Sequence, residues 1–318
     1  MYIKHIFYIV FIVLVIVVFL ELFNTGSNRD KIIAGNKTKE LFLDTVINYT
    51  PNVVIEELPD IIAENSGLVW YRDLFWTFND SDGSPDLFAF DPQSGRIVQT
   101  IRIVNADNID WEDIAQDEQY IYIGDVGNND GSRTELIIYK VEKESIPDGK
   151  DGSVEARVIE YSYPEQWDYE PGYHNTNFDC EAFFCSENKI YLFTKNWLDR
   201  QTYLYTIPVT EGVYQAEVID TFNADGLLTA ADISPDKSMI ALLGYKDYNP
   251  FLWLMEVNDN GVFEGNKIRL DMSSIYNYQT ESVVFTSDDT IYFSSEISTT
   301  PHCLFNIPVS QWQGLLYK

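Results

Sequence analysis

The sequence predicts an all-β fold made of five copies of one repeated unit. In each copy a short phrase, usually acidic, is followed about ten residues later by an apolar run rich in aromatic residues. The phrases begin at Glu64, Asp110, Asp179, Ala231 and Glu281. Repeats spaced by about 40–50 residues are typical of a β-propeller, in which each repeat forms one four-stranded blade. We therefore predict a single β-propeller with five blades, or with six if residues 39–62 form more than one strand.

Apolar alternation, interrupted by turn residues, divides each repeat into strands. For the first blade we expect strands at residues 67–71, 74–78, 86–91 and 97–104. For the second blade we expect strands at residues 114–116, 120–124, 135–141 and 154–163. The third strands of the next two blades are expected at residues 201–207 and 250–257.

The last repeat is short by one strand. Only three strands can be placed before Pro308, so the fifth blade lacks its outer strand. Residues 53–58, which precede the first repeat, carry a strand pattern and have no place in the first blade. We predict that they complete the fifth blade and close the ring, because this pairing removes two exposed sheet edges.

The N-terminus predicts export and a membrane anchor. Lys4 precedes an uninterrupted apolar stretch from Ile6 to Leu20, which lies in length between a signal-peptide core and a spanning helix. We expect residues 1–23 to be an anchor or signal segment, residues 24–38 a linker, and residues 39–318 the propeller. If residues 6–23 stay uncleaved, the protein is membrane-anchored and extracytoplasmic; if they are cleaved, it is secreted or periplasmic.

Composition narrows the range of partners. The chain has 318 residues, with 50 acidic against 21 basic side chains and a formal charge of -29. This excess repels phosphate backbones, so nucleic acid is not an expected partner. We expect a monomer that binds a small molecule, or a glycan or protein ligand at the cell surface.

One loop is longer than the repeat requires. Residues 163–178 have no strand pattern and join the outer strand of the second blade to the inner strand of the third. Long loops of this kind are usually functional or mobile. Connections of this type lie at the same end of the propeller as the start of each inner strand, so the loop is expected to overhang the mouth of the central channel.

The acidic phrases predict a cation site at that mouth. The first strand of each blade lines the axis, so carboxylates near its start converge from several blades. Such carboxylates, held close together away from bulk water, take up protons or a cation. The candidate metal ligands are Glu64, Glu112, Asp125, Asn128, Glu181, Asp232 and Glu281.

Calcium is the cation that best suits this set. It accepts six to eight oxygen ligands in irregular geometry. Zinc does not suit it, because the chain has only three His and none of them recurs in the repeat. The alternative is that the acids only cap backbone amides at turns and strand starts. As catalytic candidates the sequence offers Asp232, His174 and Lys195.

Short phrases resemble calcium-dependent propellers. Trp111-Glu112-Asp113-Ile114-Ala115 precedes Ile121-Tyr122-Ile123-Gly124, and this order is similar to a calcium-binding phrase of the five-bladed calcium-activated apyrases. The repeat also resembles the gluconolactonase and regucalcin group and the phytase-like propellers. It looks most like exported bacterial propellers that carry Asp-Trp-Glu-Asp-Ile-Ala and Gly-Asp-x-Gly-Asn-Asn phrases. The resemblance implies that Glu112 binds calcium, with Glu64, Asn128 and Asp232 in similar roles.

Two classes of function remain open. The first is a metal-dependent hydrolase of a small anionic, lactone or phosphate substrate, in which a ring carboxylate activates water. The second is a non-catalytic binding or scaffold propeller at the cell surface, in which calcium is structural. The fold alone does not separate them, because propellers host both.

Overall fold

The structure is a computed structural model that describes residues 44–317, except 82 and 260. The expected anchor or signal segment (1–23) and linker (24–38) lie outside the described residues. Among the residues described, no helix combines the length and apolarity needed to cross a membrane.

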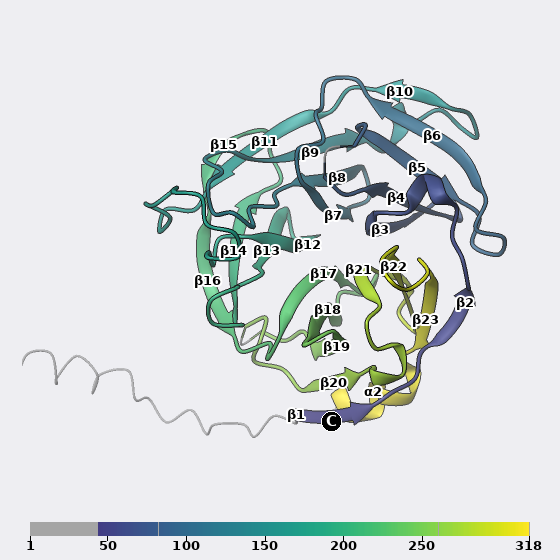
Figure 1. Cartoon of the computed structure of the whole chain (residues 1–318), viewed down its shortest axis with the longest axis vertical. Helices are drawn as coiled ribbons and strands as arrows, with labels where there is room; N and C mark the ends of the chain where they lie inside the picture. The colour runs from purple at the N-terminus through teal and green to yellow at the C-terminus, as the bar shows by residue number, and fades with distance from the viewer. Residues whose placement is uncertain (1–43, 82, 260, 318) are drawn as a thin grey trace, which may run out of the picture. The chain divides into compact units, whose positions relative to one another are not determined.

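The described strands form five separate sheets arranged around a common axis (Figure 1). Each sheet is one blade, with consecutive antiparallel strands running outward from the axis. The fold is therefore an all-β, five-bladed propeller, as the sequence predicts, and within the described residues no sixth blade is present.

The blades follow one another in the order of the sequence. Blade 1 contains β3 (Asn65–Tyr71), β4 (Leu74–Asn79), β5 (Asp86–Phe90), β6 (Ile97–Ile103) and β10 (Gly152–Val154). Blade 2 contains β7 (Trp111–Gln116), β8 (Tyr120–Asp125), β9 (Leu136–Glu142), β11 (Arg157–Ser162) and β15 (Gly212–Gln215). Blade 3 contains β12 (Cys180–Ser186), β13 (Lys189–Thr194), β14 (Thr202–Pro208) and β16 (Glu217–Phe222).

The last two blades include the N-terminal strands. Blade 4 contains β17 (Leu227–Ile233), β18 (Met239–Lys246), β19 (Asn249–Glu256), β20 (Lys267–Asp271) and β1 (Asp44–Asn48). Blade 5 contains β21 (Gln279–Ser287), β22 (Thr290–Glu296), β23 (Leu304–Pro308) and β2 (Asn52–Ile55). The short helices are η1 (Asp60–Ile62), η2 (Lys143–Ser145), η3 (Ser273–Ile275) and α2 (Ser310–Leu316).

The ring closes through the N-terminal segment. β2 pairs antiparallel with β23, and Asn52 lies opposite Asn306. The side-chain amide of Asn52 also donates to the Asn306 side-chain oxygen at 3.0 Å. The predicted closure is confirmed, with the strand at 52–55 rather than 53–58.

One strand prediction is wrong. The run at 154–163 is divided into β10, which pairs with β6 of blade 1, and β11, which pairs with β9 of blade 2. The chain changes blades at Ala156, where Asn105 accepts from the Ala156 amide at 2.8 Å and donates to its carbonyl at 2.8 Å. Apolar alternation continues across this point, so it could not reveal the change of sheet.

The hydrophobic core is divided among the interfaces between blades. Each of five buried clusters joins two neighbouring blades, and none of them fills the axis. At the interface of blades 1 and 2, for example, Phe78 packs edge-on against Trp111 with ring centroids 5.2 Å apart. The axis is therefore free to hold polar groups.

Polar side chains near the axis join the inner strands. The Asp113 carboxylate, fully buried, accepts from the backbone amides of Ile114 at 2.8 Å, Phe183 at 2.9 Å and Ala231 at 3.1 Å. It thereby connects blades 2, 3 and 4. The Asp232 carboxylate accepts from the Phe285 amide at 2.7 Å and connects blade 4 to blade 5.

Candidate functional site

A β-bulge near the start of the inner strand directs one side chain of several blades toward the axis. In blade 2, Trp111 pairs with Asp125 and Asp113 with Gly124, so Glu112 is the extra residue between them. The same irregularity places Glu181 in blade 3 and Glu281 in blade 5. Bulges commonly redirect a side chain at a functional site. Three glutamates from three blades therefore converge at the mouth of the channel.

In blade 4 the residue at the bulge is not the acid that the repeat predicts. Its bulge lies at Thr229, between Leu228 and Ala230, and Asp232 follows three residues later. The expectation that Asp232 lies level with the three glutamates is wrong. Asp232 does not line the cavity described below, and its carboxylate is engaged with the Phe285 amide. Burial raises the pKa of Asp232 to about 7.

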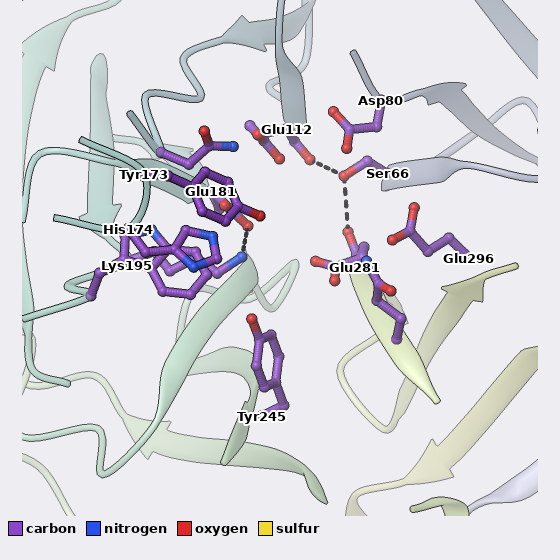
Figure 2. A pocket seen from close by; sticks show the side chains of 13 residues that line it. Ser66, Asp80, Glu112, Tyr173, His174, Glu181, Lys195, Tyr245, Glu281 and Glu296 are labelled. Atoms are coloured by element: carbon purple, nitrogen blue, oxygen red, sulfur yellow. Dashed lines mark hydrogen bonds and ion pairs between the residues drawn. The ribbon is translucent and has the colours of Figure 1, made fainter. Parts of the chain in front are cut away.

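The mouth contains a cavity of about 260 Å³ (Figure 2). Its acidic lining residues are Asp80, Glu112, Glu181, Glu281 and Glu296. Its other lining residues include Ser66, Asn129, Tyr173, His174, Lys195, Trp197, Tyr245 and Gln279. Ser66 holds two of the inner strands here, because its hydroxyl donates to the Glu112 carbonyl and, at 3.5 Å, to the Glu281 carbonyl.

Lys195 is the one lysine or arginine that lines the cavity among the described residues. It is buried and forms an ion pair with Glu181. Its ammonium also lies 4.9 Å from the Trp197 ring and 5.5 Å from the Tyr245 ring. Burial acts to lower the pKa of Lys195, but the Glu181 carboxylate outweighs it, so the pKa is raised and the lysine stays charged.

The other cavity acids have no such partner. Within the described residues, no donor reaches the carboxylate of Glu112, Glu281 or Glu296. Burial, reinforced by neighbouring carboxylates, raises the pKa of Glu112 well above its usual range and that of Glu296 to about 9. Burial likewise raises the pKa of Glu281 to about 7. Without a cation these carboxyl groups therefore favour the protonated form, and Glu296 is mainly protonated at pH 7.

The long loop overhangs the cavity, as predicted. The His174 amide donates to the Asn129 carbonyl at 2.9 Å, which holds the loop against the segment after β8. The His174 ring is stacked between Tyr173 and Trp197, with centroid separations of 3.7 and 3.4 Å. Burial lowers the pKa of His174, with a further contribution from Lys195. A neutral imidazole is therefore placed at the rim.

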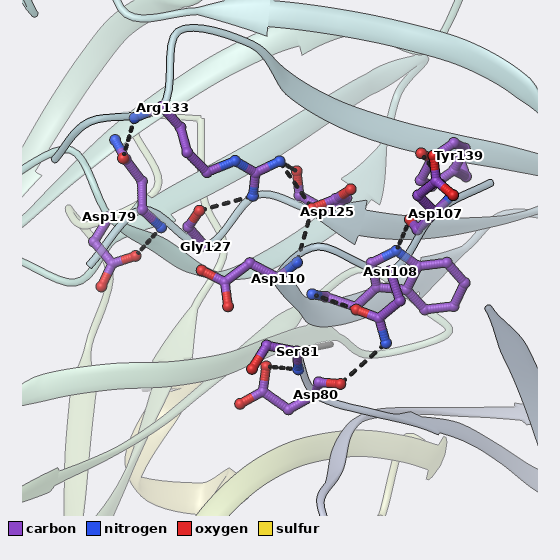
Figure 3. Close-up of polar contacts among 12 residues, drawn as sticks. Asp80, Ser81, Asp107, Asn108, Asp110, Asp125, Gly127, Arg133, Tyr139 and Asp179 are labelled. Atoms are coloured by element: carbon purple, nitrogen blue, oxygen red, sulfur yellow. Dashed lines mark hydrogen bonds and ion pairs between the residues drawn. The ribbon is translucent and has the colours of Figure 1, made fainter. Parts of the chain in front are cut away.

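Three carboxylates form the group best arranged to hold a metal ion. Oxygens of Asp80, Asp110 and Glu112 lie within 4.8 Å of one another. Burial raises the pKa of Asp110 to about 7, with neighbouring Asp80 and Asp179 adding to the effect. Figure 3 shows Asp80 and Asp110 facing each other across the space beside Gly127.

Gly127 makes room for this group. A Cβ atom at Gly127 would lie 2.3 Å from Asp110 Oδ2 and 2.3 Å from Glu112 Oε1. Both carboxylates therefore approach the backbone so closely that only glycine fits. An all-oxygen donor set of this kind suits a hard cation such as Ca²⁺.

Several sequence candidates lie apart from this group. Asp125 is fully buried and forms an ion pair with Arg133 at 2.8 Å (Figure 3). Asn128 accepts from the Arg133 amide and donates to the Phe178 carbonyl, so its side chain supports loops. Glu64 is exposed. Asp80 and Asp110, which were not among the predicted ligands, take their place. Their signal in the sequence is their position, since Asp80 follows a second strand and Asp110 directly precedes an inner strand.

Known structures resemble this chain in fold only, at low sequence identity. No family model and no curated protein matches the chain. The PQQ-bound aldose sugar dehydrogenase of Streptomyces coelicolor is similar over 82% of this chain and 97% of its own, with 8% identity and a TM-score of 0.49. A 6-phosphogluconolactonase candidate from Bacteroides uniformis is similar over 80% of this chain and 69% of its own, with 12% identity and a TM-score of 0.40.

A third similar structure is the Dos1 propeller, over 72% of this chain and 52% of its own, with 11% identity and a TM-score of 0.37. These likenesses are too distant to carry a function. The strand pairing of the chain itself establishes a five-bladed β-propeller whose channel mouth carries a strongly acidic cavity.

Proposed function

We propose that this protein is an extracytoplasmic, calcium-dependent hydrolase that acts on a small molecule in the cavity at the channel mouth. The observation that carries the proposal is the group of Asp80, Asp110 and Glu112 around Gly127, at the edge of a cavity of about 260 Å³. Asp80, Asp110 and Glu112 would hold the ion. A bound calcium ion would supply polarisation of a substrate carbonyl or phosphoryl oxygen.

His174 is the best-placed general base. It lines the cavity, and stacking between Tyr173 and Trp197 fixes the plane of its ring. Because its pKa lies below the ordinary value, the imidazole is neutral at pH 7 and able to accept a proton from water. Of the three catalytic candidates from the sequence, His174 and Lys195 line the cavity.

The charge of the cavity favours one of the substrate classes that the sequence leaves open. Lys195 is already paired with Glu181, so no free cation is available there for a phosphate group. Glu281 and Glu296 add two further carboxyl groups to the cavity, and each of them repels a phosphate group when it is ionised. A lactone or another carboxylic ester without a phosphate group therefore suits the site better than a phosphate ester.

Calcium should raise the melting temperature of the wild-type protein. A ligand that binds only the folded state stabilises it by about 2.7 kcal/mol at a hundredfold excess over its Kd. The Glu112→Gln variant should melt at or above the wild-type temperature in chelator, because it removes an acidic group that is buried among other acidic groups, and it should lose most of the calcium response. Scanning calorimetry with calcium and with chelator measures both effects.

Two further variants sharpen the test. Gly127→Ala should also lose the calcium response, because its methyl group displaces the Asp110 and Glu112 carboxylates. Glu118→Gln, an exposed acid in the β7–β8 turn at the other end of the blade, should respond as the wild type does. A wild type indifferent to calcium would refute the metal site.

Hydrolysis should require both calcium and His174. We expect a screen of lactones, carboxylic esters, nucleotides and phosphate esters to find activity on a lactone or ester that disappears in chelator. His174→Gln should lower kcat by about 10²-fold or more, the usual contribution of a general base. The wild-type rate should fall only when the pH drops below 6.5, since the base must be neutral and its pKa is lowered.

A second candidate function rests on a different observation. Loops that follow the second or fourth strand of a blade all lie at the mouth, and they expose large apolar side chains. These are Ile61, Ile109, Trp167, Tyr173, Leu198, Tyr248, Tyr276 and Ile297. Exposed aromatic rings around a mouth favour a glycan or protein ligand. Calcium binding without hydrolysis of any substrate class would favour this binding propeller over the enzyme.

A further inference from the structure

The wall of the cavity next to Asp80 carries a second pair of carboxyl groups, which is not part of the proposed calcium group (Figure 2). Glu281 on β21 and Glu296 on β22 lie on neighbouring strands, and both carboxylates point into the cavity (Figure 2). Their exposed fractions are 7% and 8%. Within the described chain neither carboxylate receives a hydrogen bond. Buried carboxylates without a donor are costly, so these two are poised for a ligand that the chain itself does not supply.

The charges of the cavity divide into three groups. Asp80, Asp110 and Glu112 face one another and suit a divalent cation. Glu181 is neutralised by Lys195. Glu281 and Glu296 remain; among the described residues no arginine or lysine lies within ion-pair distance of either, although the charge of Lys195 acts to lower the pKa of both. Glu281 and Glu296 are therefore the carboxyl groups of the cavity that belong neither to the proposed calcium group nor to the ion pair with Lys195.

The surroundings of this wall favour an organic cation over a second metal ion. Glu281 and Glu296 supply only two carboxylates, and no third acidic or imidazole ligand completes a metal-holding group with them among the described residues. The ring of Tyr245 lies nearby instead: it lines the same cavity, and Glu281 contributes to raising its pKa. Ammonium groups are attracted to aromatic faces as well as to carboxylates.

Lys195 illustrates the same chemistry inside the protein. Its ammonium binds the Glu181 carboxylate and lies near the rings of Trp197 and Tyr245, at 4.9 and 5.5 Å. The cavity thus already stabilises one ammonium group with a carboxylate and two aromatic rings. A ligand ammonium at Glu281 and Glu296 would be held in the same way, beside Tyr245.

We propose that Glu281 and Glu296 bind the ammonium group of a small organic cation, so that the ligand of this cavity carries a positively charged amine. This inference deepens the proposed function, because it gives the substrate a charged group that would orient its ester bond toward Asp80, Asp110 and Glu112. The ammonium site itself depends on neither calcium nor hydrolysis.

The test compares three probes of one size and different charge. Binding of n-butylammonium, 1-butanol and butyrate to the calcium-loaded protein is measured by ligand-observed NMR titration. We expect n-butylammonium to bind at least about tenfold more tightly than 1-butanol, as one charge-assisted hydrogen bond allows, and butyrate not to bind. Equal affinity for n-butylammonium and 1-butanol would overturn the proposal.

Variants locate the binding. Glu281→Gln and Glu296→Gln should each weaken n-butylammonium binding about tenfold, whereas the control Glu118→Gln should leave it unchanged. Both variants replace a buried carboxyl group by an amide of the same shape, so they should fold. If n-butylammonium binds equally well to both variants, its site lies elsewhere and the proposal fails.

Repeating the titration in chelator separates this proposal from the calcium-dependent enzyme. Binding of n-butylammonium that persists in chelator supports the ammonium site even if calcium binding or hydrolysis fails. Calcium calorimetry supplies the opposite check. Two calcium equivalents in the wild type, of which one disappears in Glu296→Gln, would show a second metal site and overturn the ammonium assignment.

Discussion

A chain that begins at residue 59 should lose most of its stability, because it lacks the strand that closes the ring. Such a chain has no β2, so β23 becomes an unpaired edge and blade 5 keeps three strands. Ile55 and Leu58, both buried in the cluster between blades 5 and 1, disappear as well. Truncation of one such side chain costs about 2–5 kcal/mol, so the combined loss should be at least about 4 kcal/mol.

The matched controls are chains that begin at residue 44 and at residue 50. The first retains β1 and β2, and the second lacks only β1, which adds a parallel outer strand to blade 4. Starting at residue 50 should cost less, through the lost contacts of Ile47 and Tyr49 with the cluster that includes Trp312. A loss of about 4 kcal/mol corresponds to a drop of roughly 8–16 °C in the melting temperature for a domain of this size.

Rescue in trans gives the sharpest form of this experiment. A synthetic peptide of residues 50–58 should bind the chain that begins at residue 59 and restore most of the melting temperature, because it reforms the pairing of β2 with β23. Equal melting temperatures for the chains that begin at 50 and 59 would show that the pairing does not hold the ring closed.

The second large effect is expected at Asp113. Its carboxylate accepts three backbone hydrogen bonds at the axis and so ties together the inner strands of blades 2, 3 and 4. Asp113→Ala leaves three buried amides without an acceptor, and each unsatisfied group costs about 1–3 kcal/mol. Burial of the carboxyl group, which raises the pKa of Asp113, offsets part of the stabilisation from these hydrogen bonds. We therefore expect Asp113→Ala to lower the free energy of unfolding by about 3 kcal/mol or more.

Two comparisons identify the cause of the loss. Asp113→Asn should also destabilise the fold, because one acceptor oxygen is replaced by an amide group that faces other donors. Asp148→Ala removes an exposed acid whose contact with Arg72, at 3.9 Å, should contribute little. Denaturant unfolding of the three variants gives the differences. A loss at Asp113→Ala no larger than at Asp148→Ala would contradict the role of the carboxylate as a tie between blades.

Local patterns in the sequence determined the blades. In blade 1 the expected strands at 67–71, 74–78, 86–91 and 97–104 each agree with the structure to within two residues at either end. Alternation and turn residues are local properties, and the repeat sets the number of blades. Closure by the N-terminal segment could also be predicted, because the fifth blade lacked its outer strand and residues 53–58 had a strand pattern but no place in the first blade.

Which side chains meet at the mouth was decided only by the tertiary structure. The bulge in each inner strand adds a residue that no alternation pattern reveals, so the motif containing Asp232 was aligned three residues away from its true level. The approach of Asp80 to Asp110 and Glu112 joins residues from blades 1 and 2. These contacts depend on how the blades are inclined around the axis. The packing between sheets sets that inclination. It depends on residues that are far apart in the sequence, so local patterns do not reveal it.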